Sequence, residues 1–229
     1  MTDAELADFF GCQPYFIDEV IQNHMSETGK WPFRKYVSWC HAGSVNIMRI
    51  CGTQHPDYVG LTWREFLSKG RRMEANLAAF RQNPAYYTDI VRRMPGMFLK
   101  IVDGRGYVTT DGNHRTCIGK CFLYGKDSPF MHGVNIQEQQ TDLRMLALYS
   151  RLLEKLPGYC KAEPAVTEIA RDDGNGWGTH FFDVRMRVVN GRRKGHEGIF
   201  DADELEDGLL PALRNPLAAR FGEYRKLLF

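Results

Sequence analysis

The sequence lacks the features that define several protein classes. Its 229 residues contain no uninterrupted apolar run of the length, about 18 residues, that a membrane-spanning helix requires. The chain starts with an acidic segment, whereas a secretion signal starts with basic residues and continues into an apolar stretch. Internal repeats and low-complexity tracts are also absent. We therefore expect a cytoplasmic protein with no membrane partner.

A surplus of one charge is almost absent as well. Lys and Arg total 30 while Asp and Glu total 28, which gives a formal net charge of +2. This balance does not indicate a nucleic-acid-binding protein by bulk charge. Any basic surface for DNA would have to be a local cluster.

The cysteines do not form a recognisable metal or redox motif. There are six, and none belongs to a C-x-x-C pair. In a reducing compartment we expect free thiols in or near the core. Cys117 and Cys121 lie four residues apart in a predicted helix and would share a face, so a metal or redox pair is the alternative.

The rest of the composition is that of a globular protein. Apolar residues make up 43% and charged residues 25%, and a chain of this length can bury a core without disulfides or metals. Helical and strand patterns alternate, which predicts an α/β protein. We expect helical spacing over 4–24, a short strand over 45–51, helices over 63–82, 86–93, 116–124 and 143–156, hairpins over 97–110 and 181–200, a strand over 134–137, and closing helices over 203–213 and 217–227.

One segment between a predicted strand and a predicted helix carries an anion-binding pattern: Asp-Gly-Asn-His-Arg-Thr at 111–116. Gly112 lets the backbone turn sharply and approach a ligand closely. The unpaired amides and the dipole of a helix start attract anions, and Arg115 is suited to bidentate phosphate contact. Asp111 has the chemistry to hold Mg²⁺ or to orient His114. The alternative is a capped helix with a surface His–Arg pair.

The order of elements around this motif resembles the ParB/sulfiredoxin superfamily. Its members carry a G-x-x-R signature, often D-G-x-H-R, at the start of a helix that binds nucleotide phosphates. The resemblance covers residues 58–156 and implies a ParB/sulfiredoxin-like mixed sheet. Residues 1–57 would then be an N-terminal extension, and residues 157–229 a C-terminal hairpin and helices packed on the same core.

Departures from the family pattern narrow the implied activity. Sulfiredoxins use a cysteine where this chain has Asn113, and Cys117 lies one helical turn too far, so thiolate chemistry is not expected. Chromosome-segregation ParB proteins continue into a helix-turn-helix domain, which no pattern after Leu156 indicates. Size and the missing DNA-binding tail are most similar to the Osa-type plasmid fertility-inhibition group.

This resemblance implies phosphoryl chemistry on nucleotides. We expect an ATPase or DNase that acts on plasmid or mobile DNA and uses ATP, or another nucleoside triphosphate, with Mg²⁺. One alternative is a non-catalytic, nucleotide-gated regulator that blocks a protein partner of a DNA-transfer system. The other is a small-molecule kinase of the same fold.

The resemblance also assigns roles to residues of this chain. Glu65 takes the place where kinases of this fold keep a catalytic Glu, although Thr62 and Glu65 also form the capping box of a helix start. Arg71 and Arg72 fall where family members place a ligand-facing Arg, and one of them is expected on a solvated face. Lys120 would reach phosphate or be exposed. The implied phosphate-binding set is Gly112, Asn113, His114, Arg115, Thr116 and Arg72; the catalytic set is Asp111, His114 and Glu65; the metal ligand is Asp111.

A local basic cluster lies far along the chain. Arg192, Arg193 and Lys194 occupy the tip of the second predicted hairpin, where they would contact a DNA backbone. A plain solvated turn explains them equally well. The acidic segment 201–207 that follows would weaken a continuous positive track.

Overall fold

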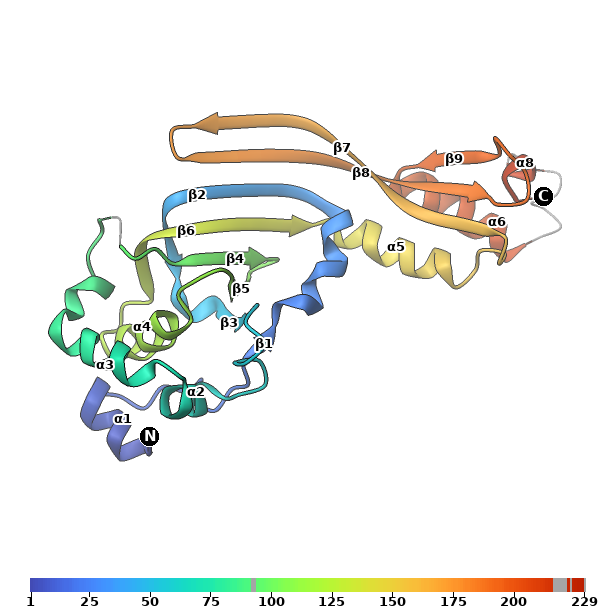
Figure 1. The fold of residues 1–229 in the computed structure, drawn as a ribbon. Coiled ribbons are helices and arrows are strands. Elements are labelled where there is room, and N and C mark those ends of the chain that lie inside the picture. Colours follow the sequence, from blue (N-terminus) through green and yellow to red (C-terminus); the bar gives the residue numbers. More distant parts are fainter. Residues whose placement is uncertain (92–93, 216–221, 223, 229) are drawn as a thin grey trace. The chain divides into compact units, whose positions relative to one another are not determined.

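The computed structural model describes residues 1–91, 94–215, 222 and 224–228 (Figure 1). The chain divides into two compact units. Unit 1 comprises Met1–Thr28, Ser38–Gln139 and Asp173–Thr179, and unit 2 comprises Gly29–Val37, Gln140–Asp172 and His180–Phe229. Each unit therefore draws on segments that are far apart in the sequence.

The described residues contain nine strands in one mixed sheet, which confirms the predicted α/β class. They are β1 (Gln22–Asn23), β2 (Arg34–Asn46), β3 (Ile50–Thr53), β4 (Phe98–Val102), β5 (Arg105–Val108), β6 (Phe130–Thr141), β7 (Cys160–Gly174), β8 (Trp177–Asn190) and β9 (Glu197–Phe200). The strand order is β1-β3-β5-β4-β6-β2-β8-β7, with β9 paired to β8. The segment expected as an extension, 1–57, supplies three of these strands.

In unit 1 the hairpin of β4 and β5 carries the chain toward the motif. Asp103 and Gly104 have φ of 49° and 87°, the left-handed pair that a tight hairpin turn needs. β5 then pairs in parallel with β3, and β4 pairs in parallel with β6. The predicted hairpin is confirmed, and residues 109–112 connect its end to a helix start.

Helices of unit 1 gather on one side of these strands (Figure 1). They are α1 (Asp3–Phe10), α2 (Trp63–Lys69), α3 (Met73–Gln82) and α4 (Asn113–Gly125). Buried residues of β4, such as Leu99 and Ile101, share one core with Ile118 of α4. Because this packing buries α4 along its length, the helix start is held firmly against the sheet.

The two cysteines of α4 belong to that core. Cys117 and Cys121 are fully buried, free thiols. Burial raises the pKa of Cys117 well above its usual value and that of Cys121 to about 12. Both thiols are therefore protonated at neutral pH, as expected for core residues.

Unit 2 has a core of its own. Its helices are α5 (Leu143–Leu153), a π-helical turn over Glu204–Leu209, α6 (Leu210–Arg214) and α8 (Arg225–Leu228). Met145, Leu148 and Leu152 of α5 pack with Met186 of β8 and with Leu205. The acidic segment 201–207 is paired in part, because Arg144 contacts Asp203 at 2.7 Å and Glu206 at 2.8 Å.

Several predicted elements differ from those observed. The segment 86–93 does not form the expected helix: a 3₁₀ turn covers Pro84–Tyr87, and residues 92–93 lie outside the described part. The helical spacing predicted over 4–24 forms a helix only as far as Phe10, and a 3₁₀ helix follows at His24–Phe33. The strand predicted over 45–51 is interrupted by a 3₁₀ turn at Ile47–Arg49, between the end of β2 and the start of β3. Residues 160–174, for which no strand was predicted, form β7. The expected helix over 217–227 lies largely outside the described residues. No helix within the described ranges is long and apolar enough to cross a membrane.

Candidate anion-binding site

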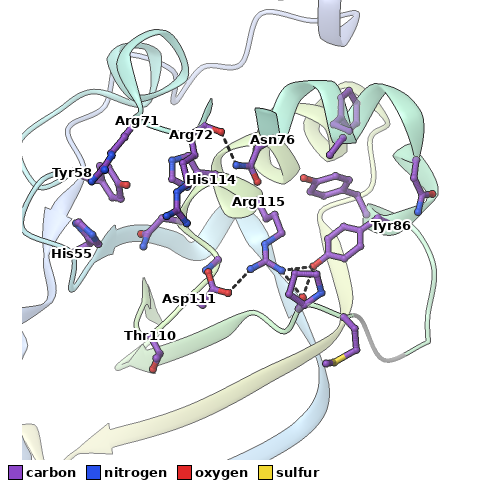
Figure 2. Close-up of a pocket in the computed structure, with 18 of the residues that line it drawn as sticks. His55, Tyr58, Arg71, Arg72, Asn76, Tyr86, Thr110, Asp111, His114 and Arg115 are labelled. Carbon is purple, nitrogen blue, oxygen red and sulfur yellow. Dashed lines mark hydrogen bonds and ion pairs between the residues drawn. The ribbon is translucent and has the colours of Figure 1, made fainter. Parts of the chain in front are cut away.

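Unit 1 contains a cavity of about 740 Å³ beside the start of α4 (Figure 2). Three segments form its walls: the turn between α2 and α3, the stretch from Asn83 to Tyr87, and the motif from Thr110 to Arg115. One face of α3 (Asn76, Ala79, Phe80 and Gln82), together with His55, Asp57, Tyr58, Met94 and Pro95, completes the lining. The structure therefore brings Asp111, Gly112, Asn113, His114, Arg115 and Arg72 together, as the sequence predicts.

Gly112 starts α4 in a conformation that suits glycine. Its φ is +115°, and a Cβ there would lie 3.1 Å from the Cγ of Met97. The Gly112 N–H donates to Oδ1 of Asp111 at 2.7 Å, and the first hydrogen bond of the helix runs from Thr116 N–H to the Gly112 carbonyl at 2.7 Å. Among the described residues no side chain caps this helix. The amides of residues 113–115 are consequently available to an anion.

The start of α3 lies at the same cavity. Arg71 and Arg72 are exposed and line it, and no side chain in the described part of the chain caps α3 at Arg72. The Arg72 carbonyl accepts a hydrogen bond from the Asn76 side chain at 2.7 Å. Two uncapped helix starts and two exposed guanidinium groups thus share one hollow.

Arg115 is held by three acceptors. One terminal nitrogen, Nη1, donates to the Tyr86 hydroxyl at 3.2 Å and to the Pro95 carbonyl. The other, Nη2, donates to Oδ2 of Asp111 at 2.7 Å. Burial opposes the charge on Arg115, yet Tyr86 and Asp111 outweigh it, so the pKa of the guanidinium is raised. Arg115 is a fixed cation at any accessible pH.

His114 is held neutral by its surroundings. Burial lowers its pKa, and the nearby charge of Arg72 lowers it further. The ring packs against Phe66 with a centroid distance of 5.0 Å and against Tyr58 at 5.5 Å, and Tyr58 stacks on His55 at 4.3 Å. Its Nε2 is buried with no hydrogen-bond partner among the described residues. The site therefore offers a neutral imidazole with unused hydrogen-bonding capacity.

The side chains of Asn113 and Thr116, which the resemblance assigns to phosphate binding, make structural contacts instead. Oδ1 of Asn113 accepts a hydrogen bond from the Thr53 hydroxyl at 2.6 Å, which ties the start of α4 to β3. Thr116 is fully buried and does not contribute to the cavity lining. The Asn113 contribution to an anion is then its backbone amide.

Glu65 and Lys120 do not reach the cavity. The Glu65 carboxylate accepts from the Thr62 N–H at 3.0 Å and pairs with Lys69 at 3.2 Å, so it acts as the capping box of α2. The hydrogen bond from Thr62 N–H, more than any other contact, lowers the pKa of Glu65. Lys120 is buried: its Nζ donates to the Ile50 carbonyl at 2.6 Å, and burial lowers its pKa to about 8.

The basic cluster on the second hairpin belongs to unit 2, whereas the cavity lies in unit 1. Arg192, Arg193 and Lys194 occupy the turn between β8 and β9 and are exposed. The guanidinium of Arg192 covers the ring of Tyr159 at 4.3 Å. The turn presents positive charge to solvent with one Arg anchored on an aromatic ring.

Several lining residues have no counterpart in the sequence-based prediction. They are His55, Asp57, Asn76, Asn83, Tyr86, Met94 and Pro95. The sequence analysis predicts a helix over 86–93, although the Asn83-Pro84 and Pro95-Gly96 pairs at its two ends are typical of turns. The contacts of Tyr86 and Pro95 with Arg115 depend on tertiary packing, which local patterns do not encode.

The carboxylates of the site fit a cation that arrives with its ligand. No group of three or more His, Cys, Asp or Glu able to hold a metal occurs in the described part of the chain. Asp57 and Asp111 both line the cavity. Mg²⁺ is commonly bound by one or two carboxylates together with substrate phosphates, so this donor set suits a nucleotide-borne Mg²⁺.

Comparison of the chain with protein-family models, with curated proteins and with solved structures finds no match. The ParB/sulfiredoxin resemblance therefore stays a prediction, which depends on the 111–116 motif and on the order of the elements around it. What the chain does has to be inferred from the cavity and the groups that face it.

Proposed function

We propose that this protein binds a nucleoside triphosphate, ATP in the first instance, in the cavity of unit 1 and performs phosphoryl chemistry there. In this proposal the chain has a ParB/sulfiredoxin-like fold and acts as an ATPase or DNase on plasmid or mobile DNA. The observation that carries it is the convergence of two uncapped helix starts with Arg71 and Arg72 on one cavity of about 740 Å³. That volume lies within the usual range of small-molecule sites.

Each group has a defined part in binding. The amides of residues 113–115 point along the positive end of the α4 dipole and would hold one phosphate group. Arg72 and Arg71 would add charge from the start of α3, where they would neutralise the remaining phosphate oxygens. Asp111 and Asp57 would hold Mg²⁺, which supplies charge stabilisation on the phosphates when bound. The cavity thus surrounds a polyphosphate on two sides.

His114 is the residue best placed for proton transfer. It is neutral at physiological pH because burial and Arg72 lower its pKa, and Nε2 has no competing partner among the described residues. A neutral imidazole is able to accept a proton from an attacking water. Glu65 has no such role in this proposal, because its carboxylate is engaged in the α2 cap.

A regulator without turnover is the second candidate function. Two observations favour it: Glu65 is engaged in the α2 cap and does not reach the cavity, and Asp111 is already paired with Arg115. Such a protein would use nucleotide binding to control a partner of a DNA-transfer system. The missing Glu equally argues against the small-molecule kinase, which would need a carboxylate to activate its acceptor.

Nucleotide binding is tested by thermal shift with ATP, ADP, CTP and GTP, each with Mg²⁺ and with EDTA. A ligand that binds the folded state raises the melting temperature by mass action. We expect a clear rise in the melting temperature of wild type. The rise should be smaller for Arg72→Ala, because the loss of one charge-assisted contact should weaken nucleotide affinity about tenfold. Arg193→Ala, an exposed Arg of unit 2, is the control and should bind like wild type.

The two candidate functions differ in turnover. Phosphate release from ATP and nicking of supercoiled plasmid are measured on the full chain under the conditions that give the thermal shift. If wild type releases phosphate or nicks the plasmid and His114→Gln does neither, the protein is an enzyme. Binding without either reaction supports the regulator. No shift with any of the four nucleotides would remove both.

A further inference from the structure

The two terminal nitrogens of Arg115 are held differently: Nη1 has two acceptors, whereas Nη2 contacts only Asp111. Nη1 is fixed by the Tyr86 hydroxyl at 3.2 Å and by the Pro95 carbonyl, both in the cavity wall. Nη2 contacts Oδ2 of Asp111 at 2.7 Å (Figure 2). The Arg115 side chain is 12% exposed while that of Asp111 is 58% exposed. Asp111 can therefore leave the pair, whereas Arg115 is kept in place.

A phosphate at the start of α4 would compete with Asp111 for Nη2. A carboxylate and a phosphate are both anions whose oxygens accept a charge-assisted hydrogen bond from a guanidinium N–H. Only the partner of Nη2 has to change, since Nη1 keeps its two acceptors. The displaced carboxylate cannot go far, because its Oδ1 accepts from the Gly112 N–H at 2.7 Å. A bare polyphosphate would then face a negative charge within its own site.

A divalent cation on the phosphates reverses the sign of that interaction. The released Asp111 carboxylate would become a ligand of the cation, and repulsion would turn into attraction. Cation and nucleotide would then favour each other's binding, and the coupling is reciprocal by thermodynamic necessity.

We infer that Asp111 is an internal competitor for the phosphate site, which makes the cavity select nucleotides complexed with a divalent cation over free nucleotides. The inference rests on the proposed nucleotide binding and adds the form of nucleotide that the site accepts. Asp111 is in this view a specificity-determining residue. It blocks Arg115 in the ligand-free protein and binds the cation in the complex.

The test measures the dissociation constant of ATP by isothermal titration calorimetry on the full chain, once with Mg²⁺ and once with EDTA. The central variant is Asp111→Asn, whose amide oxygen still accepts from the Gly112 N–H but whose charge is gone. Glu74→Gln is the matched control: it removes an exposed carboxylate in the first turn of α3, beside the cavity but outside its lining, that does not pair with Arg115. Asp111→Ser is a second uncharged variant that can still accept from the Gly112 amide.

Wild type should bind ATP much more tightly with Mg²⁺ than with EDTA. Asp111→Asn should bind ATP in EDTA between about five and 150 times more tightly than wild type, the usual range of a coupling between two sites. Its affinity should depend far less on Mg²⁺. Glu74→Gln should stay within about twofold of wild type in EDTA, because an exposed charge outside the cavity lining contributes little.

Three outcomes overturn the inference. Equal gains for Asp111→Asn and Glu74→Gln in EDTA would show an effect of net charge alone. Unchanged or weaker binding in EDTA by Asp111→Asn and Asp111→Ser, with melting temperatures like wild type, would show that Asp111 only supports the helix start. Absence of ATP binding by wild type and every variant would remove the proposed function itself, a result distinct from the other two.

Discussion

Two helices of unit 1 begin in opposite ways. At α2 the Thr62 hydroxyl accepts from the Glu65 N–H at 3.1 Å and the Glu65 carboxylate accepts from the Thr62 N–H at 3.0 Å. At α4 a left-handed Gly112 starts the helix and no described side chain takes up the first amides. The α2 start is closed by the protein itself, and the α4 start is open toward a cavity.

The difference extends to the other helices. α1 has a capping box from Thr2 and Glu5, and α5 has Asp142 accepting from Met145 N–H at 2.8 Å. Among α1 to α5, the two without a side-chain cap are α3 and α4, and both start at the cavity. Because a missing cap costs a helix about 1 kcal/mol, two missing caps at one cavity indicate a site that its ligand completes.

The largest effect on stability and on ATP binding is expected from adding a methyl group at Gly112, the residue that starts α4. Gly112→Ala places a Cβ 3.1 Å from Met97 Cγ on a residue with φ of +115°. The free energy of unfolding should fall by about 2 kcal/mol, and ATP binding should be lost because the amides of residues 113–115 move. Chemical denaturation and thermal shift measure the two effects.

Gly158→Ala is the matched control for this substitution. Its added Cβ would meet no heavy atom within 4 Å, and the position lies in unit 2. It should leave both stability and ATP binding near wild type. A Gly112→Ala protein that retains wild-type ATP affinity would contradict the role given to the α4 start.

The sequence predicts the helix starts better than the walls around them. The Thr62–Glu65 capping box, the hairpin at Asp103 and the position of Gly112 were readable because each depends on residues within a few positions of one another. Arg72, which the resemblance singled out, lines the cavity. Local chemistry therefore located the residues on which the proposed phosphate site depends.

What the sequence could not give depends on distant contacts. The Pro95 carbonyl and the Tyr86 hydroxyl reach Arg115 only after the chain folds over 20 and 29 positions, respectively. Lys120 was expected near phosphate or in solvent, yet its Nζ lies between the rings of Phe16 and Trp63 at 4.4 and 4.3 Å. Only tertiary packing decides whether a polar residue on a helix faces a cavity or a core.

A smaller effect is expected at the closed start. Thr62→Ala removes the acceptor for the Glu65 N–H and should lower the free energy of unfolding by about 1 kcal/mol. ATP affinity should not change, because Glu65 and Thr62 do not line the cavity. Thr62→Ser, which keeps the hydroxyl, should restore stability. A loss of ATP affinity in a well-folded Thr62→Ala protein would show that α2 contributes to the site after all.

The smallest expected effect separates the two helix starts by pH. The pKa of His114 is lowered mainly by burial, so the unfolded chain takes up a proton first as the pH falls below the ordinary value of about 6.5. The unfolded state then binds more protons, and the stability that a neutral His114 contributes is lost as the pH falls through its folded-state pKa.

The pKa of Glu65 is lowered as well, so the stability that Glu65 contributes persists until the pH falls below the ordinary carboxyl value of about 4.3. Between pH 6.5 and 4.5, about the interval between these two values, the α4 start should weaken and the α2 start should not, while the buried His24 contributes the same decline to all variants. Urea denaturation at several pH values measures the free energy of unfolding. As the pH falls, this free energy should decline less for His114→Gln than for wild type, whereas for Thr62→Ala it should decline in parallel with wild type. Parallel curves for all three proteins would mean that His114 titrates as an ordinary surface histidine, and that the α4 start does not hold it neutral.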